Sequence, residues 1–275
     1  MKIIRDHFQN FKQYCIPKAQ LIIADIPYNI GINAFASNPA WYVDGDNSNG
    51  ESKLAGKEFF DTDKDFRPAE FMHFCSQMMR KESKGEANNT APCMIVFCEF
   101  WQQFELRDLA QKHGFKGCIN LVFRKNFSAQ VLKANMKVVG NAEYGLLLYR
   151  DKLPKFNNKG KMIFNVMDWE SDEKTEMYRK IHPTQKPVKL IEKLIETFTD
   201  EGDVVIDPCA GSGSSIIACI NKNRKGFGFE IKKDFAKDAQ EWCDMTVKVK
   251  TEISENGFSV TLIKSQSKEQ LCMFA

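Results

Sequence analysis

The sequence has no apolar run approaching the roughly 18 residues that a membrane-spanning helix requires. Its first residues, MKIIRDHFQNFKQY, also lack the apolar core of a secretory signal peptide. Hydrophobic residues make up 43% of the chain and charged residues 27%, which is typical of folded, water-soluble proteins. These features exclude an integral membrane protein and a disordered chain, and they predict a cytoplasmic location.

Paired cysteines are missing too. None of the nine cysteines belongs to a C-x-x-C pair, and several lie inside apolar runs, such as Cys93 and Cys98 in CMIVFC. Cysteine in such runs is typical of small core residues in a reducing compartment. We therefore expect neither disulfides nor a metal site.

Internal repeats and low-complexity tracts are also absent, and 275 residues suffice for one large α/β domain or a domain with an added module. Apolar strand patterns alternate with helical ones, which predicts a mostly parallel sheet covered by helices on both faces. The expected strands are 21–25, 93–98, 118–125, 143–150 and 204–207, and the expected helices begin at Pro68, Trp101, Pro187 and Ser214. Residues 246–275 are expected to form an edge hairpin and a polar tail.

A glycine turn follows the strand VVID in the stretch VVIDPCAGSGSS. Gly211 and Gly213 allow the backbone to approach a ligand, and the next helix offers free N–H groups at its first turn. Glu230, at the tip of the following strand GFGFEI, is placed to accept both hydroxyls of a ribose. This combination predicts a nucleotide-like cofactor, but Ile216 replaces the third glycine of the dinucleotide fingerprint, which disfavours NAD. The alternative is a tight strand–helix turn beside a surface acid.

The stretch LIIADIPYN ends a buried strand with Asp25, Pro27 and Tyr28. A carboxylate, a rigid turn and an aromatic ring suit the binding of a planar ring that bears an amine. A simple turn after a strand also uses Asp and Pro, so this stretch alone leaves both interpretations open.

Basic residues are concentrated in the middle of the chain. Residues 116–161 contain ten Lys or Arg and two acids, a local charge of +8, whereas the whole chain carries +3. Such a segment suits a polyanion bound in a fixed position, although a solvated lysine-rich face has the same composition.

Three motifs together resemble a known family. ADIPYN, HPTQKP and DPCAGSGSS…GFEI occur in the order typical of β-class amino-methyltransferases of DNA, and the resemblance covers roughly residues 1–245. It implies a Rossmann-like sheet, S-adenosylmethionine as cofactor, and methylation of an exocyclic amine in double-stranded DNA. It also implies a catalytic motif at 21–31, a target-recognition region at approximately 116–180, and cofactor motifs at 182–230.

The resemblance also assigns roles in cofactor binding. Asp6 matches an acid that contacts the cofactor adenine, although Arg5 replaces the family's usual glycine before it. Glu230 would bind the ribose, and Lys186 would approach the cofactor carboxylate, with a solvent-exposed lysine at a helix start as the alternative. The complete implied set is Asp6, Asp25, Thr184, Gln185, Lys186, Asp207, Ala210, Gly211, Ser212, Gly213, Ser214 and Glu230.

The catalytic residues implied by the resemblance are Asp25, Ile26, Pro27 and Tyr28. The Asp25 carboxylate and the Ile26 carbonyl would accept hydrogen bonds from the target amine, and Tyr28 would stack on a base flipped out of the duplex. Ile26 replaces the family's usual first proline. An acid at position 25 favours adenine N6. Cytosine N4 in DNA, an RNA substrate, or an inactive cofactor-binding protein are the alternatives.

The basic region and the tail of the chain indicate further partners. Arg124, Lys125, Lys133 and Lys137 are candidates for phosphate or base contacts in DNA. Gln270–Phe274, in KEQLCMFA, resembles a short peptide that docks on the sliding clamp, with a strand packed on the sheet as the alternative. A homodimer is a candidate assembly, although the sequence does not define the oligomeric state.

Overall fold

The computed structural model describes residues 1–28, 66–82, 85, 89–126, 130–133, 138–169, 172, 178–181 and 185–255. Thr184, Lys137 and the predicted clamp-binding peptide Gln270–Phe274 lie outside these residues. Lys133 lies in a described strand, but its side chain is outside the described part of the chain. Among the helices that the structure describes, none is long and apolar enough to span a membrane.

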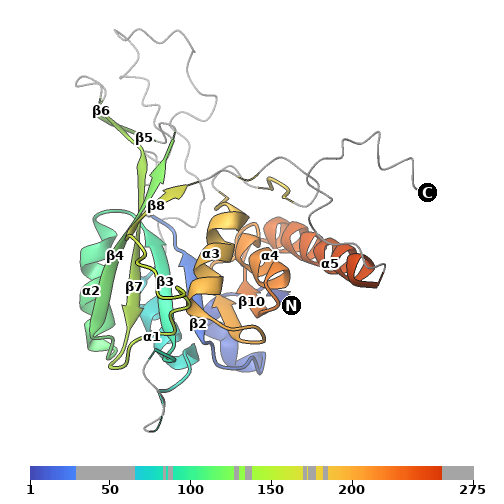
Figure 1. Cartoon of the computed structure of the whole chain (residues 1–275), viewed down its shortest axis with the longest axis horizontal. Coiled ribbons are helices and arrows are strands. Elements are labelled where there is room, and N and C mark those ends of the chain that lie inside the picture. Colours follow the sequence, from blue (N-terminus) through green and yellow to red (C-terminus); the bar gives the residue numbers. More distant parts are fainter. Residues whose placement is uncertain are drawn as a thin grey trace, which may run out of the picture.

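Strands and helices alternate along the chain (Figure 1). The first half contains β1 (Lys2–Ile4), the 3-10 helix η1 (Phe8–Gln13), β2 (Leu21–Asp25), α1 (Pro68–Met78), β3 (Cys93–Cys98), α2 (Gln102–Lys112) and β4 (Gly117–Lys125). The second half contains β5 (Gln130–Lys133), β6 (Val138–Gly140), β7 (Ala142–Tyr149), β8 (Val166–Trp169), α3 (Val188–Phe198), β9 (Val204–Asp207), α4 (Ser214–Asn221), β10 (Lys225–Phe229) and α5 (Lys233–Glu255).

Eight strands form one mixed sheet in the order β1-β10-β9-β2-β3-β7-β4-β8. Neighbours from β1 to β3 are parallel, whereas β7 runs antiparallel to both β3 and β4. β5 and β6 pair with each other outside this sheet, and Figure 1 shows them beyond the end of β4. The predicted α/β fold with a mostly parallel sheet is confirmed.

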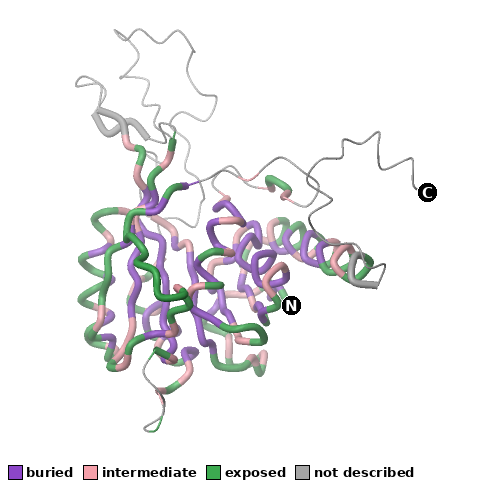
Figure 2. Tube along the Cα trace, in the orientation of Figure 1, coloured by how far each residue is buried: buried purple, intermediate pink, exposed green. Residues whose placement is uncertain are grey.

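The central strands of the sheet are buried along most of their length (Figure 2). In β3 all six residues are buried, because Ile95 and Phe97 face the layer of α3, α4 and α5 while Met94 and Val96 face the layer of α1 and α2. A central strand covered on both faces is therefore apolar throughout its length.

The C-terminal helix differs from the sequence prediction. An edge hairpin is expected from residue 246, but α5 continues to Glu255, so the prediction is wrong for residues 246–255. Trp242, Cys243 and Thr246 are buried on one side of this helix. Val247 and Val249 alternate with lysines, which is typical of a strand, but Val247 is 43% exposed on the helix, so this alternation does not mark a strand with one buried face.

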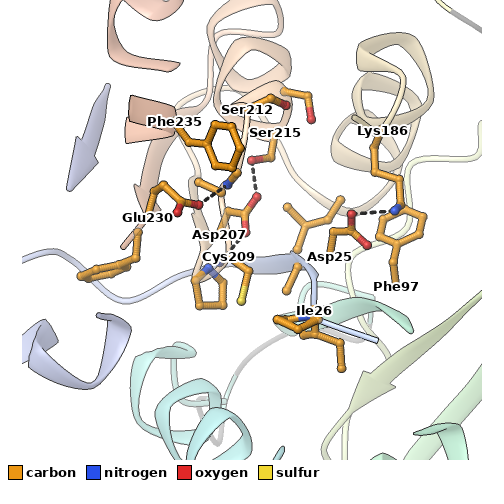
Figure 3. A pocket seen from close by; sticks show the side chains of 18 of the residues that line it. Asp25, Ile26, Phe97, Lys186, Asp207, Cys209, Ser212, Ser215, Glu230 and Phe235 are labelled. Atoms are coloured by element: carbon orange, nitrogen blue, oxygen red, sulfur yellow. Dashed lines mark hydrogen bonds and ion pairs between the residues drawn. The ribbon is translucent and has the colours of Figure 1, made fainter. Parts of the chain in front are cut away.

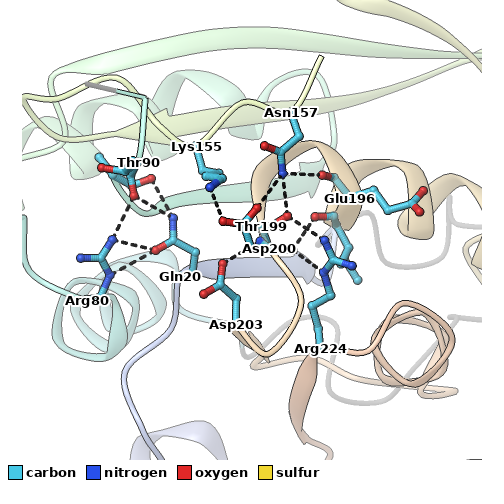
Figure 4. A network of polar contacts seen from close by, with 12 residues as sticks. Gln20, Arg80, Thr90, Lys155, Asn157, Glu196, Thr199, Asp200, Asp203 and Arg224 are labelled. Atoms are coloured by element: carbon cyan, nitrogen blue, oxygen red, sulfur yellow. Dashed lines mark hydrogen bonds and ion pairs between the residues drawn. The ribbon is translucent and has the colours of Figure 1, made fainter. Parts of the chain in front are cut away.

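A polar network lies at the amino ends of the central strands (Figure 4). The Arg224 guanidinium donates to the Thr199 carbonyl at 2.7 Å and to the Thr199 hydroxyl at 2.9 Å, and Asn157 donates to the same carbonyl. Arg80 donates to the Gln20 amide oxygen at 2.8 Å. The bonds of Arg224 and Asn157 join the loop before β10 and the segment around Asn157 to the end of α3, and the Arg80 bond joins the segment after α1 to the loop before β2.

We expect Arg224→Ala to lower the free energy of unfolding by about 2–4 kcal/mol, because Arg224 is 6% exposed and its loss leaves buried oxygens of Thr199 without these donors. Denaturant unfolding followed by circular dichroism measures the change. Arg107→Ala is the matched control, since that side chain is 50% exposed, and it should stay within about 0.5 kcal/mol of the parent. Equal losses in the two variants would contradict the structural role of Arg224.

Candidate active site

A cavity of about 320 Å³ opens at the carboxyl ends of β2, β9 and β10. These strands are parallel and adjacent, so the acids that end or follow them, Asp25, Asp207 and Glu230, meet at one edge of the sheet. Figure 3 shows Asp207 between Glu230 and Asp25. The lining includes residues 7–8, 25–28, 185–186, 207–212, 214–215 and 229–232.

The glycine turn after β9 forms one wall of this cavity. Gly211 and Gly213 have φ values of +52° and +81°, in the left-handed region that favours glycine. A Cβ at position 213 would lie 2.9 Å from Cβ of Ala239 in α5. Because the turn needs both this backbone conformation and this close packing, Gly213 places the first turn of α4 next to the cavity.

Asp207 is held at the base of the turn. The Ser215 hydroxyl donates to one carboxylate oxygen and the Cys209 N–H donates to the other at 2.9 Å. Burial raises the pKa of Asp207 to about 7, with the charges of Asp25 and Glu230 adding to the effect while the two hydrogen bonds oppose it. The carboxyl group is thus poised between its neutral and ionised forms near neutral pH.

Glu230 lies beside the turn with both carboxylate oxygens bonded to backbone. The Gly211 N–H donates to one at 2.9 Å, and the Lys232 N–H donates to the other at 2.8 Å. Burial raises the pKa of Glu230, and these bonds partly offset the rise. The acid is therefore fixed in orientation on the wall of the cavity, and each oxygen retains a second lone pair.

Lys186 occupies the other end of the cavity, where its ammonium lies between two carboxylates. Nζ is 2.6 Å from Oδ2 of Asp25 and 2.5 Å from Oε1 of Glu143 on β7. Lys125 on β4 pairs with Oε2 of the same glutamate at 2.5 Å. The Tyr28 hydroxyl lies 2.6 Å from Glu143 and 3.2 Å from Asp25. The two lysines and the two carboxylates thus form a largely buried ion-pair network with no net charge.

The two carboxylates of this ion-pair network, Asp25 and Glu143, differ in acidity. Burial raises the pKa of Asp25, and the Glu143 charge adds to the rise against the opposing Lys186 charge. Burial also acts to raise the pKa of Glu143, but Lys186 and Lys125 outweigh it and lower the value to about 2. For Lys186, the same two carboxylates outweigh burial and raise its pKa. Glu143 is thus the firmly ionised anion, and Asp25 is the more basic one.

Aromatic rings surround the ammonium groups. Nζ of Lys186 lies 5.4 Å from the ring centroids of Tyr28 and Phe97 and 5.8 Å from that of Trp169. Nζ of Lys125 lies 4.5 Å from the Trp169 ring. Cation–π attraction in this shielded site helps to offset the cost of removing the two charges from water.

Several predicted cofactor residues lie together at the cavity, including Gln185, Lys186, Asp207, Ala210, Gly211, Ser212, Ser214 and Glu230. Lys186 is 6% exposed, so the alternative of a solvent-exposed lysine at a helix start is excluded. Gln185 lines the cavity, although its amide also donates to the Arg179 carbonyl.

Asp6 does not lie with this set. Its carboxylate accepts hydrogen bonds from the Tyr14 hydroxyl, the Asn10 amide and the His7 N–H, and it is absent from the described lining of the cavity. His7 and Phe8 line the cavity in its place. Asp6 therefore organises the start of η1, which argues against a direct contact between its carboxylate and a cofactor.

The predicted DNA contacts also separate into two kinds. Arg124 is exposed on β4 and pairs with Asp168, another exposed residue. Lys125 points to the opposite face, where it is largely buried in its ion pair with Glu143, and this argues against the predicted phosphate contact. Successive residues of a strand face opposite sides of the sheet, so Arg124 and Lys125 cannot share one outer surface.

Glu143 is the residue that the sequence interpretation misses, because residues 143–150 are expected only to form a strand of the sheet. The available signal is an acid next to an apolar strand sequence, since a buried carboxylate is normally paired. Its partners come from β4, from Tyr28 and from the segment before α3, none of which is a neighbour in sequence. Among the residues that the structure describes, no cluster of His, Cys, Asp and Glu is arranged to hold a metal ion.

The sheet order, the glycine turn and the acidic cavity together define the class I methyltransferase fold. A family model described as DNA methylase, for N6 and N4 methyltransferases, matches residues 19–241. The chain therefore belongs to this DNA methylase family.

Two relatives illustrate the range of similarity. The type II methyltransferase M.HpaI of Haemophilus parainfluenzae is 39% identical over 88 residues, covering 32% of this chain and 28% of M.HpaI. The DNA adenine methyltransferase YhdJ of Escherichia coli K12 is 25% identical over 248 residues, covering 84% of this chain and 78% of YhdJ. The match thus spans less than a third of M.HpaI but more than three quarters of YhdJ.

Solved structures share the fold. The M1.HpyAVI–SAM complex has a TM-score of 0.60 and 21% identity, covering 87% of this chain and 98% of that chain. The cytosine-N4-specific PvuII DNA methyltransferase has a TM-score of 0.62 and 13% identity, covering 91% of each chain. The same architecture therefore extends over almost the whole of both molecules.

We expect Ile26→Pro to lower the free energy of unfolding by about 1–3 kcal/mol. The Ile26 N–H donates to the Phe97 carbonyl at 3.3 Å, and its side chain is buried against the α1 and α2 layer. Proline removes that donor. Ile26→Val keeps it and should cost about 0.5–1.5 kcal/mol through lost packing. Urea unfolding measures both, and a proline variant as stable as the parent would refute this account.

Asp207 should make stability depend on pH. The unfolded acid ionises near 3.8, whereas the folded one keeps its proton up to about pH 7, so the folded state binds more protons in this interval. Stability of the parent therefore falls relative to Asp207→Asn as pH rises from about 4 to about 7, by up to about 4 kcal/mol. Chemical unfolding at several pH values measures the difference. The exposed control Asp238→Asn should follow the parent, and an Asp207→Asn curve parallel to the parent would be the contrary result.

Proposed function

We propose that this protein transfers a methyl group from S-adenosylmethionine to the N6 amine of a flipped-out adenine in double-stranded DNA. The observation that carries the proposal is the single cavity that Asp25, the glycine turn and Glu230 share. A site for the reacting amine and a site for a nucleoside cofactor thus lie within one connected space. Membership of the DNA methylase family supports the same conclusion.

The carboxylates and aromatic rings of the cavity suit S-adenosylmethionine. Glu230, fixed by the Gly211 N–H, has lone pairs left for two ribose hydroxyls, and Phe8 and Phe235 offer rings to an adenine. Asp207, whose pKa is raised to about 7, would ionise next to an ammonium group such as that of methionine. When bound, the cofactor supplies an electrophilic methyl group on a positively charged sulfur.

Asp25 would activate the target amine. The lone pair of an adenine amine is delocalised into the ring, and a hydrogen bond from the amine to a carboxylate localises it and offsets the positive charge that develops on nitrogen. The Ile26 carbonyl would accept the second N–H. Since burial raises the pKa of Asp25, its carboxylate is also suited to hold the proton that the nitrogen releases after methyl transfer.

Tyr28 and Pro27 would form a wall against the flipped base. Both line the cavity, and Tyr28 is oriented by its bond to Glu143. Stacking of a base on such a ring contributes about 1–3 kcal/mol, which compensates part of the stacking lost when the base leaves the duplex. The Tyr28 ring therefore serves binding, whereas its hydroxyl contacts the ion-pair network of Lys186.

Arg124 is the described candidate for a DNA contact outside the cavity. It is exposed at the end of β4, from which the chain continues into β5 and β6. A guanidinium here could exchange its pairing with Asp168 for a phosphate. Lys133, in β5, and Lys137 remain candidates on the basis of the sequence alone.

We expect Asp25→Ala to lower the rate of methyl transfer by at least about 100-fold, because it removes the acceptor for the amine while leaving the glycine turn and Glu230 in place. Duplex DNA is incubated with protein and S-adenosylmethionine, and its nucleosides are then measured by mass spectrometry. N6-methyladenine should form with the parent and with the control Asp238→Ala, which changes an exposed acid on α5.

The other outcomes separate the alternatives. Formation of N4-methylcytosine instead of N6-methyladenine would show that cytosine is the target and that the protein still methylates an exocyclic amine. Methylation of RNA alone would change the substrate class. Cofactor binding by the parent without methylation of any tested nucleic acid would indicate an inactive binding protein and overturn the proposal.

A further inference from the structure

The strongest unused feature of the site is Glu143. It is 6% exposed, lies on β7 opposite Phe123 of β4, and points into the layer that contains Lys186. We propose that Glu143 is a positioning residue that keeps oxygen Oδ1 of Asp25 open to the target amine by binding the hydroxyl proton of Tyr28. This role rests on the proposed function, in which Asp25 accepts a hydrogen bond from that amine.

The distances assign the Tyr28 proton. A phenol carries one proton, and the Tyr28 oxygen lies 2.6 Å from Oε1 of Glu143 but 3.2 Å from Oδ1 of Asp25. Donation to Glu143 is therefore the stronger interaction, and it draws the proton away from Asp25. Both lone pairs of Oδ1 then remain available, so an amine N–H meets an acceptor that no internal donor has weakened.

Lys186 acts on the other oxygen of Asp25. Its ammonium bridges Oδ2 of Asp25 and Oε1 of Glu143, so it aligns the two carboxylates without occupying Oδ1. The Asp25 side chain is 32% exposed, and Asp25 lines the cavity. One oxygen of Asp25 is thus anchored to protein, while the other is accessible to a substrate.

Lys125 makes Glu143 a dependable acceptor. It binds Oε2 from the side of β4, so Glu143 is held between two ammonium groups. The pKa of Glu143, lowered to about 2 by these cations against the effect of burial, shows that it remains ionised at neutral pH. Although Asp25 is the more basic carboxylate, Glu143 is ionised and lies 2.6 Å from the phenol oxygen, whereas Asp25 lies 3.2 Å away, so the shorter distance favours Glu143.

A neutral amide at position 143 should reverse this arrangement. The amide group of Gln can donate to the Tyr28 oxygen, which leaves the phenol proton free to turn toward Oδ1 of Asp25. An internal donor would then share Oδ1 with the target amine and weaken the hydrogen bond that activates it. Removal of the Tyr28 hydroxyl should then restore part of the methylation rate. It would not restore the rate if Glu143 only stabilised the fold through its ion pairs.

The kinetic test measures single-turnover methylation of duplex DNA by the parent, Glu143→Gln, Tyr28→Phe and the double variant Tyr28→Phe/Glu143→Gln. We expect Glu143→Gln to be about 10- to 100-fold slower, with dissociation constants for S-adenosylmethionine and DNA within about twofold of the parent. The double variant should be at least about fivefold faster than Glu143→Gln, since the competing donor is gone. A parental rate in Glu143→Gln, or a double variant no faster than it, would overturn the inference.

A charge-balanced variant guards against a folding defect. Glu143→Gln leaves Lys125 and Lys186 with one carboxylate, whereas Lys125→Met/Glu143→Gln removes one charge of each sign. Thermal unfolding should show that this variant is folded. We expect it to be as slow as Glu143→Gln, because the phenol proton is again free to reach Asp25; a parental rate would contradict the role of Glu143.

A spectroscopic test needs no turnover. Tyrosine labelled with ¹³C at Cζ gives a signal for Tyr28, assigned by its loss in Tyr28→Phe, and its chemical shift reports the bond to a carboxylate. We expect the signal to move in Glu143→Gln and to stay in place in the control Glu105→Gln, on α2. An unchanged signal in Glu143→Gln would overturn the inference whether or not the parent methylates DNA. A shifted signal in a protein that methylates nothing would instead overturn the proposed function, and the role of Glu143 toward the amine with it.

Discussion

One buried ammonium group, that of Lys186, connects the parts of this molecule that surround the reacting position. It joins the segment before α3 to Asp25 at the end of β2 and to Glu143 on β7. Three segments far apart in sequence thereby meet at one atom. Withdrawing such charges from water is costly, and the cost is offset here because each charge has a counterion and the aromatic rings enclose the group.

The sheet order determines which acids can meet there. β2 lies between β9 and β3, so the strand that carries Asp25 is adjacent to the strand that carries Asp207 and the glycine turn. The residues proposed to bind the cofactor and those proposed to bind the target base are consequently built on neighbouring strands of one rigid sheet. The distance between them depends on backbone hydrogen bonds within the sheet and very little on loops.

Sequence patterns predict much of this fold and part of the site. The strand at 21–25, the helices beginning near Pro68, Gln102 and Val188, and the glycine turn follow from local periodicity and turn chemistry, which a single sequence displays. Glu143 could not be recognised, because its importance lies in side chains that only the antiparallel placement of β7 brings near it.

Asp6 and Lys125 are the opposite case, because the sequence assigns them roles that their contacts argue against. Both match a simple rule, an acid at a family position and a lysine in a basic segment, yet their partners are Tyr14 and Glu143. The continuation of α5 to Glu255 is a further example, since Lys250 in this extension donates to the Asn221 carbonyl at the end of α4 at 3.0 Å, a partner that the sequence does not indicate. Pairing within a fold, and not composition, decides where such charged groups act.

The reversed direction of β7 has a consequence for exchanging recognition segments between related enzymes. Because β7 is antiparallel to β3, its first residues lie at the catalytic edge, and Gly140 at the end of β6 is only a short connection away from Glu143. Side chains alternate between the two faces of a strand, so a graft that shifts β7 by one residue would turn Glu143 toward the α1 and α2 layer. Such grafts must therefore keep Glu143 on the same face of β7. A graft that changes the length before β7 by an odd number of residues could bring a new recognition segment and still inactivate the enzyme.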